Sequence, residues 1–159
     1  MFIDYFAYEN LNSEKINEHE IELINEEDTR IKAYPDVTEI VRTLRVDCMG
    51  RNDHIAIASR ALNRSLALKA IDLFGWTPYI SSFQIHPGSK VIHMNDIKFD
   101  LKFNKFNDVL FFDDDQRNLN ELKSIGVVGY KLDPQTGLTI TDVLNGLTLF
   151  DNVDTQKNT

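Results

Sequence analysis

The sequence predicts a three-layer α/β domain built on a parallel sheet. Short apolar runs alternate with amphipathic stretches of helical length, polar residues follow several of those runs, and no Pro-, Gly- or Ser-rich linker divides the chain. The 159 residues fit one ordinary domain, and 42% hydrophobic residues are enough to fill one core. We therefore expect a core domain over residues 34–150, preceded by an acidic flap over 1–33 and followed by a disordered tail over 151–159.

The N-terminal flap is strongly acidic. From Glu14 to Asp28 the sequence has seven carboxylates in fifteen residues, and apolar residues such as Ile21 and Leu23 still interrupt them. This pattern is typical of a solvated, partly mobile flap, and an ordered lid made of an amphipathic hairpin or a short helix is an equal alternative.

The elements of the core follow from hydrophobic periodicity. Pro35 suits a first helical turn, and apolar residues at helical spacing follow it. Gly75 and Gly126 each stand where a helix would end in a left-handed residue. The elements expected, in order, are a helix from about 35, a strand at 54–58, a helix at 61–74, a strand at 79–85, a helix at 90–99, a strand at 109–112, a helix at 118–125, a strand at 127–132 and a helix at 139–150.

Composition excludes several classes of function. There are 25 acidic and 17 basic residues, so a net charge of −8 disfavours binding to nucleic-acid phosphate. No apolar run approaches the roughly 20 residues that a membrane helix needs, and the first residues lack the basic start of a signal peptide. Cys48 is the single cysteine and cannot form an internal disulfide. We expect a cytoplasmic, or alternatively nuclear, protein with no nucleic-acid or membrane partner; the sequence does not predict its oligomeric state.

Polar residues follow three of the predicted strands. Ser59 and Arg60 follow the first, Lys90 comes after the second within a Pro-Gly-Ser-Lys sequence, and three aspartates at 113–115 follow the third. Ligands of parallel sheets bind at the carboxyl ends of the strands, so these side chains are candidates for one site. A hydroxyl and cations bind phosphate oxygens, whereas carboxylate oxygens bind Mg²⁺.

Each of these residues also has a purely structural interpretation. Ser59 is in a position typical of a helix N-cap, Lys90 could be a surface residue that opens a helix, and the aspartates could complement a helix dipole. Taken one at a time, the structural interpretation is favoured. Their occurrence at three successive strand ends favours a phosphate and metal site.

The order of these motifs resembles the magnesium-dependent phosphatase family of the haloacid dehalogenase (HAD) superfamily. The likeness is carried by Tyr34–Val37, Ile57–Arg60, Ile85–Lys90, Phe111–Asn118 and the closing segment Gly137–Leu147. The resemblance implies a HAD-like, Rossmannoid fold with a small cap or none. It also implies a Mg²⁺-dependent phosphomonoester hydrolase that acts on protein phosphotyrosine or on small sugar phosphates.

The resemblance further implies roles for individual residues. It assigns phosphate binding to Ser59, Arg60 and Lys90, the magnesium ion to Asp114 with Asp113 beside it, and support of the loop to Asn118.

The chain departs from the family at its first motif. HAD phosphatases carry Asp-x-Asp, in which the first aspartate attacks phosphorus and the second acts as general acid and base. One register places Asp4 at the general-acid position and Phe2 at the position of the nucleophile, and another register leaves both positions unfilled. The nucleophile is not found, and no N-terminal strand can be assigned. We expect either an N-terminally truncated, weakly active phosphatase or an inactive relative that binds phosphate or magnesium, and the intact strand-end residues favour the first.

Overall fold

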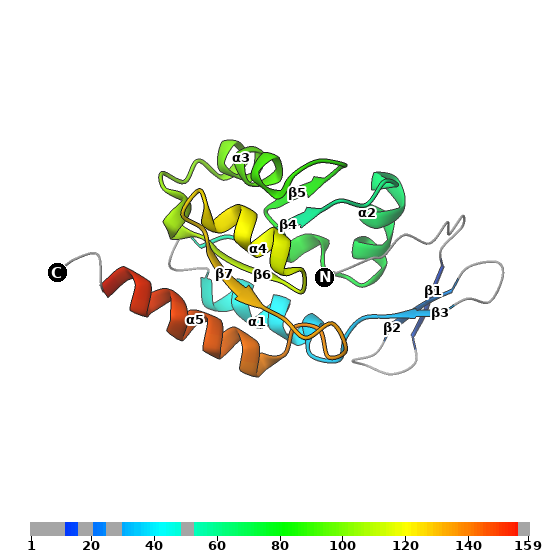
Figure 1. Cartoon of the computed structure of the whole chain (residues 1–159). Coiled ribbons are helices and arrows are strands. Elements are labelled where there is room, and N and C mark those ends of the chain that lie inside the picture. Colours follow the sequence, from blue (N-terminus) through cyan, green and yellow to red (C-terminus); the bar gives the residue numbers. More distant parts are fainter. Residues whose placement is uncertain (1–11, 16–20, 25–29, 49–52, 156–159) are drawn as a thin grey trace. The chain divides into compact units, whose positions relative to one another are not determined.

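A computed structural model describes residues 12–15, 21–24, 30–48 and 53–155 (Figure 1). The chain forms two compact units, Phe2–Gly88 and Ser89–Thr159. Asp4, and with it the segment that the resemblance assigns to the first motif, lies outside the described residues.

The first unit begins with a small antiparallel sheet. Its strands are β1 (Asn12–Lys15), β2 (Ile21–Ile24) and β3 (Arg30–Lys32), and β2 pairs with both of the others. Leu23, in the middle strand, is fully buried. Of the forms considered for the acidic flap, the described part therefore adopts paired strands and not a helix.

The rest of the first unit contains a parallel pair of strands and two helices. The elements are α1 (Val37–Cys48), β4 (Ala56–Ser59), α2 (Arg64–Leu73), the short 3-10 helix η1 (Thr77–Tyr79) and β5 (Ser82–Ile85). β4 and β5 are parallel, with Ser59 opposite Ile85. The buried Trp76 stacks on Phe74 at 4.8 Å, and its indole Nε1 donates a hydrogen bond of 3.1 Å to Thr38 Oγ1, which ties α1 to the turn after α2.

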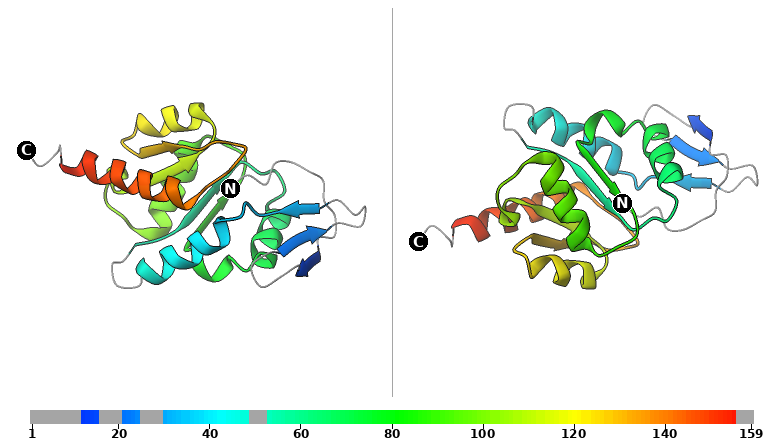
Figure 2. Two further views of the ribbon diagram at one scale, coloured as in Figure 1. Left: turned by 90° about the horizontal axis from the view of Figure 1, so that it is seen from below. Right: turned by 90° about the horizontal axis from the view of Figure 1, so that it is seen from above.

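The second unit has the same strand-and-helix alternation. Its elements are α3 (Lys90–Leu101), the 3-10 helix η2 (Phe106–Asp108), β6 (Leu110–Asp113), α4 (Gln116–Lys123), β7 (Val128–Lys131) and α5 (Ile140–Thr155). β6 and β7 are parallel, and α4 and α5 pack against them on opposite faces, as Figures 1 and 2 show. Met94, Leu122 and Val127 form a buried core where α3 packs against α4.

The α/β class and the parallel pairing predicted from the sequence are confirmed. Within the described residues the parallel strands form two pairs, β4–β5 and β6–β7.

The last helix extends to Thr155, so residues 151–155 belong to α5 and not to the expected tail. Gly75 and Gly126 have φ of 74° and 98°, the left-handed region that the sequence pattern predicted at the ends of these helices. None of the described helices combines the length and apolar character that a bilayer span needs.

Candidate functional site

Asp113, the last residue of β6, is the centre of a buried polar cluster. Its side chain is only 2% exposed. Asn118 Nδ2 donates to both of its carboxylate oxygens at 3.0 Å, and the backbone N–H of Asp115 donates to Oδ1 at 2.8 Å. These three contacts fix the carboxylate at the carboxyl end of the strand and compensate the loss of its hydration.

Lys90 places a buried cation beside this carboxylate. It is the first residue of α3, and its side chain is 3% exposed, which excludes the interpretation that it is a surface residue. The ammonium Nζ lies 3.8 Å from Asp113 Oδ2 and 5.6 Å from the centre of the Phe111 ring. A lysine is rarely buried unless it is paired with an opposite charge, and here Asp113 supplies that charge.

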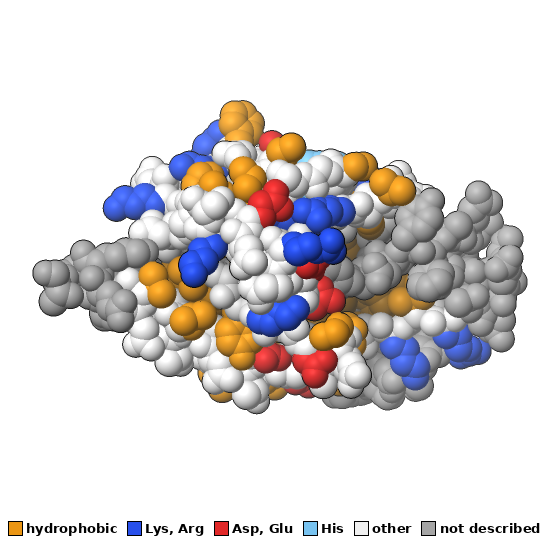
Figure 3. All heavy atoms as spheres, in the orientation of Figure 1, with side chains coloured by type: hydrophobic (Ala, Val, Ile, Leu, Met, Phe, Trp, Pro, Cys, Tyr) orange, Lys and Arg blue, Asp and Glu red, His pale blue; other side chains and the backbone are white. Residues whose placement is uncertain are grey.

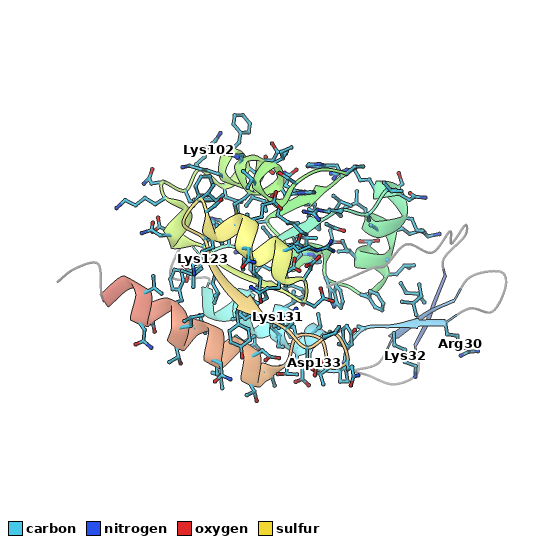
Figure 4. All side chains as sticks on the ribbon, viewed as in Figure 1. Arg30, Lys32, Lys102, Lys123, Lys131 and Asp133 are labelled. Atoms are coloured by element: carbon cyan, nitrogen blue, oxygen red, sulfur yellow. The ribbon has the colours of Figure 1, made fainter. Side chains whose placement is uncertain are left out.

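Asp114 is the next carboxylate along the chain and is only half-buried. Burial raises its pKa above the ordinary value, and the neighbouring negative charge of Asp113 raises it further. The charge of Lys131 acts in the opposite direction, and the same Lys131 Nζ donates to the Asp114 carbonyl oxygen. Figure 4 shows Lys131 at the end of β7, with Asp133 just beyond it. A cation bound at Asp114 would relieve the repulsion between the two carboxylates.

Asp115 has a structural role. It is the N-cap of α4 and accepts the backbone N–H of Arg117 at 2.8 Å. The guanidinium of Arg117 also donates to its carboxylate, and these hydrogen bonds lower the pKa of Asp115 to about 2. For this one of the three aspartates, the interpretation as a helix-end residue is the correct one.

Ser59 and Arg60 belong to the first unit. Ser59 Oγ accepts the backbone N–H of Ala61 at 3.2 Å, and Arg60 is exposed. The N-cap of α2 is Asn63, whose Oδ1 accepts the N–H of Leu66 at 3.0 Å. Ser59 is therefore not a helix cap, although its position at the end of β4 suggested one.

Three charged residues near the strand ends are not among the site residues that the sequence predicts. Glu121 Oε2 accepts the backbone N–H of Lys90 at 3.2 Å. Arg64 Nη1 donates to the carbonyl oxygens of Phe83 and Ile85 at 3.0 and 3.4 Å, where β5 ends. The third is Lys131 of β7. Glu121 could have been found because it lies three residues after Asn118 and so shares a face of the same helix.

Asn118 and Asp114 offer oxygen atoms of the kind that Mg²⁺ prefers. Asn118 Oδ1 is buried and has no hydrogen-bond partner, and Asp114 supplies a carboxylate next to the cluster. Mg²⁺ binds carboxylate and amide oxygens and usually keeps water or phosphate oxygens in its shell. Asp114 and Asn118 therefore fit as part of the ligand set of such an ion, with water or phosphate oxygens as the other ligands. Among the described residues no group of three His, Cys, Asp or Glu side chains is arranged to hold a metal.

A hollow of about 710 Å³ in the second unit lies away from this cluster. It is lined by residues of η2, α4, β7 and α5 and of the turn before β7, among them Leu119, Lys123, Val127 and Leu149. These residues surround the amino end of β7, whereas Asp113 lies at the carboxyl end of the parallel strand β6. On the face shown in Figure 3, hydrophobic side chains gather over α5. The hollow is therefore not the candidate phosphate site.

The second unit thus has an α/β arrangement in which the parallel strand β6 ends in a buried carboxylate beside a buried lysine. Residues 2–153 match the sequence profile of the Acid Phosphatase family, and the chain belongs to this family. It is also similar to a human protein named Magnesium-dependent phosphatase 1, with 28% identity over 125 residues, which are 79% of this chain and 67% of the relative. These findings confirm the resemblance to the magnesium-dependent phosphatases.

Proposed function

We propose that the chain is a Mg²⁺-dependent phosphomonoester hydrolase. The observation that carries the proposal is the buried cluster of Lys90, Asp113 and Asn118 next to Asp114 at the end of β6. Membership of the Acid Phosphatase family supports the hydrolase class, and similarity to the human Magnesium-dependent phosphatase 1 supports magnesium.

In this proposal the chain's own side chains bind and orient the phosphoryl group. Lys90 neutralises phosphoryl oxygens, and Ser59 and Arg60 provide further donors for the phosphate. Asp114, with Asn118 Oδ1 as a further oxygen, would hold the magnesium ion. When bound, the ion supplies positive charge where negative charge develops on the transferred group.

Burial of Lys90 would strengthen its interaction with a bound phosphoryl group. A fixed cation in a site with little water interacts more strongly with a phosphoryl oxygen than an exposed lysine does. Asp113 lies 3.8 Å from the ammonium group and balances its charge when no phosphate is present.

The N-terminal motif keeps a second candidate open, a protein that binds phosphate or Mg²⁺ without turnover. It is favoured by the register in which Asp4 is the general acid and Phe2 stands at the nucleophile's position. The substrate class that we propose for the active form is a phosphoprotein bearing phosphotyrosine, or a small sugar phosphate.

Turnover of p-nitrophenyl phosphate with and without Mg²⁺, together with vanadate binding, tests the proposal. Magnesium-dependent turnover that is lost in Asp114→Ala would support the hydrolase. Vanadate binding without turnover would support the second candidate. If turnover is absent and neither vanadate nor Mg²⁺ binds, both are wrong.

Inorganic phosphate binding tests the roles of Lys90 and Ser59. Lys90→Ala should weaken binding more than Ser59→Ala, because only the lysine contributes a charge-assisted bond. Ser65→Ala is the matched control, since Ser65 is an exposed serine in the first turn of α2. Undiminished binding in both Lys90→Ala and Ser59→Ala would place the anion elsewhere.

A further inference from the structure

One face of α4 contacts both members of the buried ion pair. Asn118 Nδ2 donates to the carboxylate of Asp113, and Glu121 Oε2, one helical turn later, accepts the backbone N–H of Lys90 at 3.2 Å. The two residues thus connect the same helix to the end of β6 and to the start of α3.

The contact with Glu121 falls at a particular point of α3. Lys90 is the first residue of this helix, so its N–H is one of the donors that have no partner within the helix. A carboxylate at a helix N-terminus is favourable for the additional reason that it faces the positive end of the helix dipole. Ser89, the N-cap, serves a different donor, because its Oγ accepts the N–H of Ile92 at 3.3 Å.

The position of the Lys90 backbone determines where its ammonium group can reach. The side chain is buried, and Nζ lies 3.8 Å from Asp113 Oδ2. Loss of the Glu121 contact would leave the Lys90 N–H without this acceptor, and a small displacement of a binding group is enough to lower a rate substantially.

We propose that Glu121 is a positioning residue that holds Lys90 in the phosphate site. It acts through the backbone of Lys90 and does not itself touch the substrate. The consequence for activity depends on the proposed phosphatase function, whereas the consequence for Lys90 itself does not.

Three variants separate positioning from simple helix capping. Glu121→Ala removes the acceptor of the Lys90 N–H, and Glu121→Gln keeps an oxygen acceptor of the same length without the charge. Ser89→Ala is the matched control, because it removes another acceptor from the same helix end and leaves the Glu121 contact in place.

The first measurement is the rate at which acetic anhydride acetylates Lys90, determined by mass spectrometry. The exposed Lys123 serves as the internal reference. We expect Lys90 to react several-fold faster in Glu121→Ala and at the parental rate in the other two variants. An unchanged rate in Glu121→Ala, or an equal increase in Ser89→Ala, would overturn the proposal, whether or not the chain is a phosphatase.

The second measurement is kcat and KM for p-nitrophenyl phosphate with Mg²⁺, at a temperature where every variant is folded. A misplaced lysine should lower kcat by about tenfold in Glu121→Ala, with Glu121→Gln close to the parent. If the parent hydrolyses nothing, the proposed function is wrong and the acetylation result alone decides the role of Glu121. An active parent with full kcat in Glu121→Ala would contradict positioning.

Discussion

The side-chain amide nitrogen of Asn118 lies 3.0 Å from both carboxylate oxygens of Asp113. The two residues are five positions apart, one at the end of β6 and the other in the first half of α4, and both are buried. This contact fixes the carboxylate that lies beside Lys90. It also leaves Asn118 Oδ1 buried without a hydrogen-bond partner.

Replacing Asn118 should destabilise the chain even though the amide carries no charge. In Asn118→Ala the Asp113 carboxylate loses its side-chain donor while it remains buried, at a cost of about 1–3 kcal/mol. Urea unfolding at neutral pH measures this loss. Asn120→Ala, an exposed change on the same helix, should stay within about 0.5 kcal/mol of the parent. Equal effects of the two changes would contradict the role assigned to Asn118.

Removing the buried cation should affect both stability and phosphate binding. Lys90→Met leaves Asp113 as a buried charge without its counterion, which costs about 3 kcal/mol. The double variant with Asp113→Asn should recover much of that stability, because the remaining charge is also gone. Phosphate binding should stay weak in both variants. A double variant no more stable than Lys90→Met would show that the two charges do not interact.

Millimolar Mg²⁺ should raise the melting temperature of the parent chain, since an ion that binds the folded form stabilises it by mass action. Asp114→Asn should abolish the rise, because it replaces the proposed carboxylate ligand. Differential scanning fluorimetry with Mg²⁺ and with matched ionic strength of NaCl measures the effect. Asp108→Asn, at an exposed aspartate in η2, is the control and should keep the response. A full response in Asp114→Asn would exclude this residue as a ligand.

The raised pKa of Asp114 predicts a pH dependence in the absence of metal. Burial, followed by the charge of Asp113, makes the ionised form less favourable in the folded chain than in the unfolded chain. This unfavourable contribution is present above the raised pKa, and it disappears as the pH falls through that pKa. Asp114→Asn should therefore be more stable than the parent at pH 7, with the gain shrinking toward acid pH. Urea unfolding across pH 7 to 4 in EDTA checks the trend, and a gain that grows on acidification would contradict it.

Gly146 should be intolerant of a methyl group although it lies within a helix. A Cβ at this position would lie 2.7 Å from two ring carbons of Phe112, because α5 packs closely on β6. Gly146→Ala should therefore cost about 1–3 kcal/mol, against the gain that alanine gives in an exposed helix. Thermal unfolding is the measurement, and addition of Phe112→Leu should recover part of the loss. A more stable Gly146→Ala would show that the ring moves away at little cost.

The order of elements and the charged strand ends could be predicted from the sequence because both depend on local patterns. Helical spacing after Pro35 predicts α1, and the apolar run before Asp113 predicts β6. For the acidic segment before Tyr34 the sequence predicts a mobile flap or an ordered lid equally, and only the structure shows the antiparallel strands β1, β2 and β3. Interspersed carboxylates weaken the apolar alternation there, so the pattern does not distinguish a strand from a helix.

By itself the sequence determined the α/β class, the position of Lys90 at a helix start and the position of Asp113 and Asp114 after a strand. Only the tertiary structure decided that Lys90 is buried against Asp113, that Asn118 holds this carboxylate, and that Glu121 contacts the backbone of Lys90. The physical reason is that helix and strand periodicity depend on neighbours a few residues away. Burial of a lysine depends instead on how α3, α4 and β6 pack, which brings together side chains more than twenty residues apart.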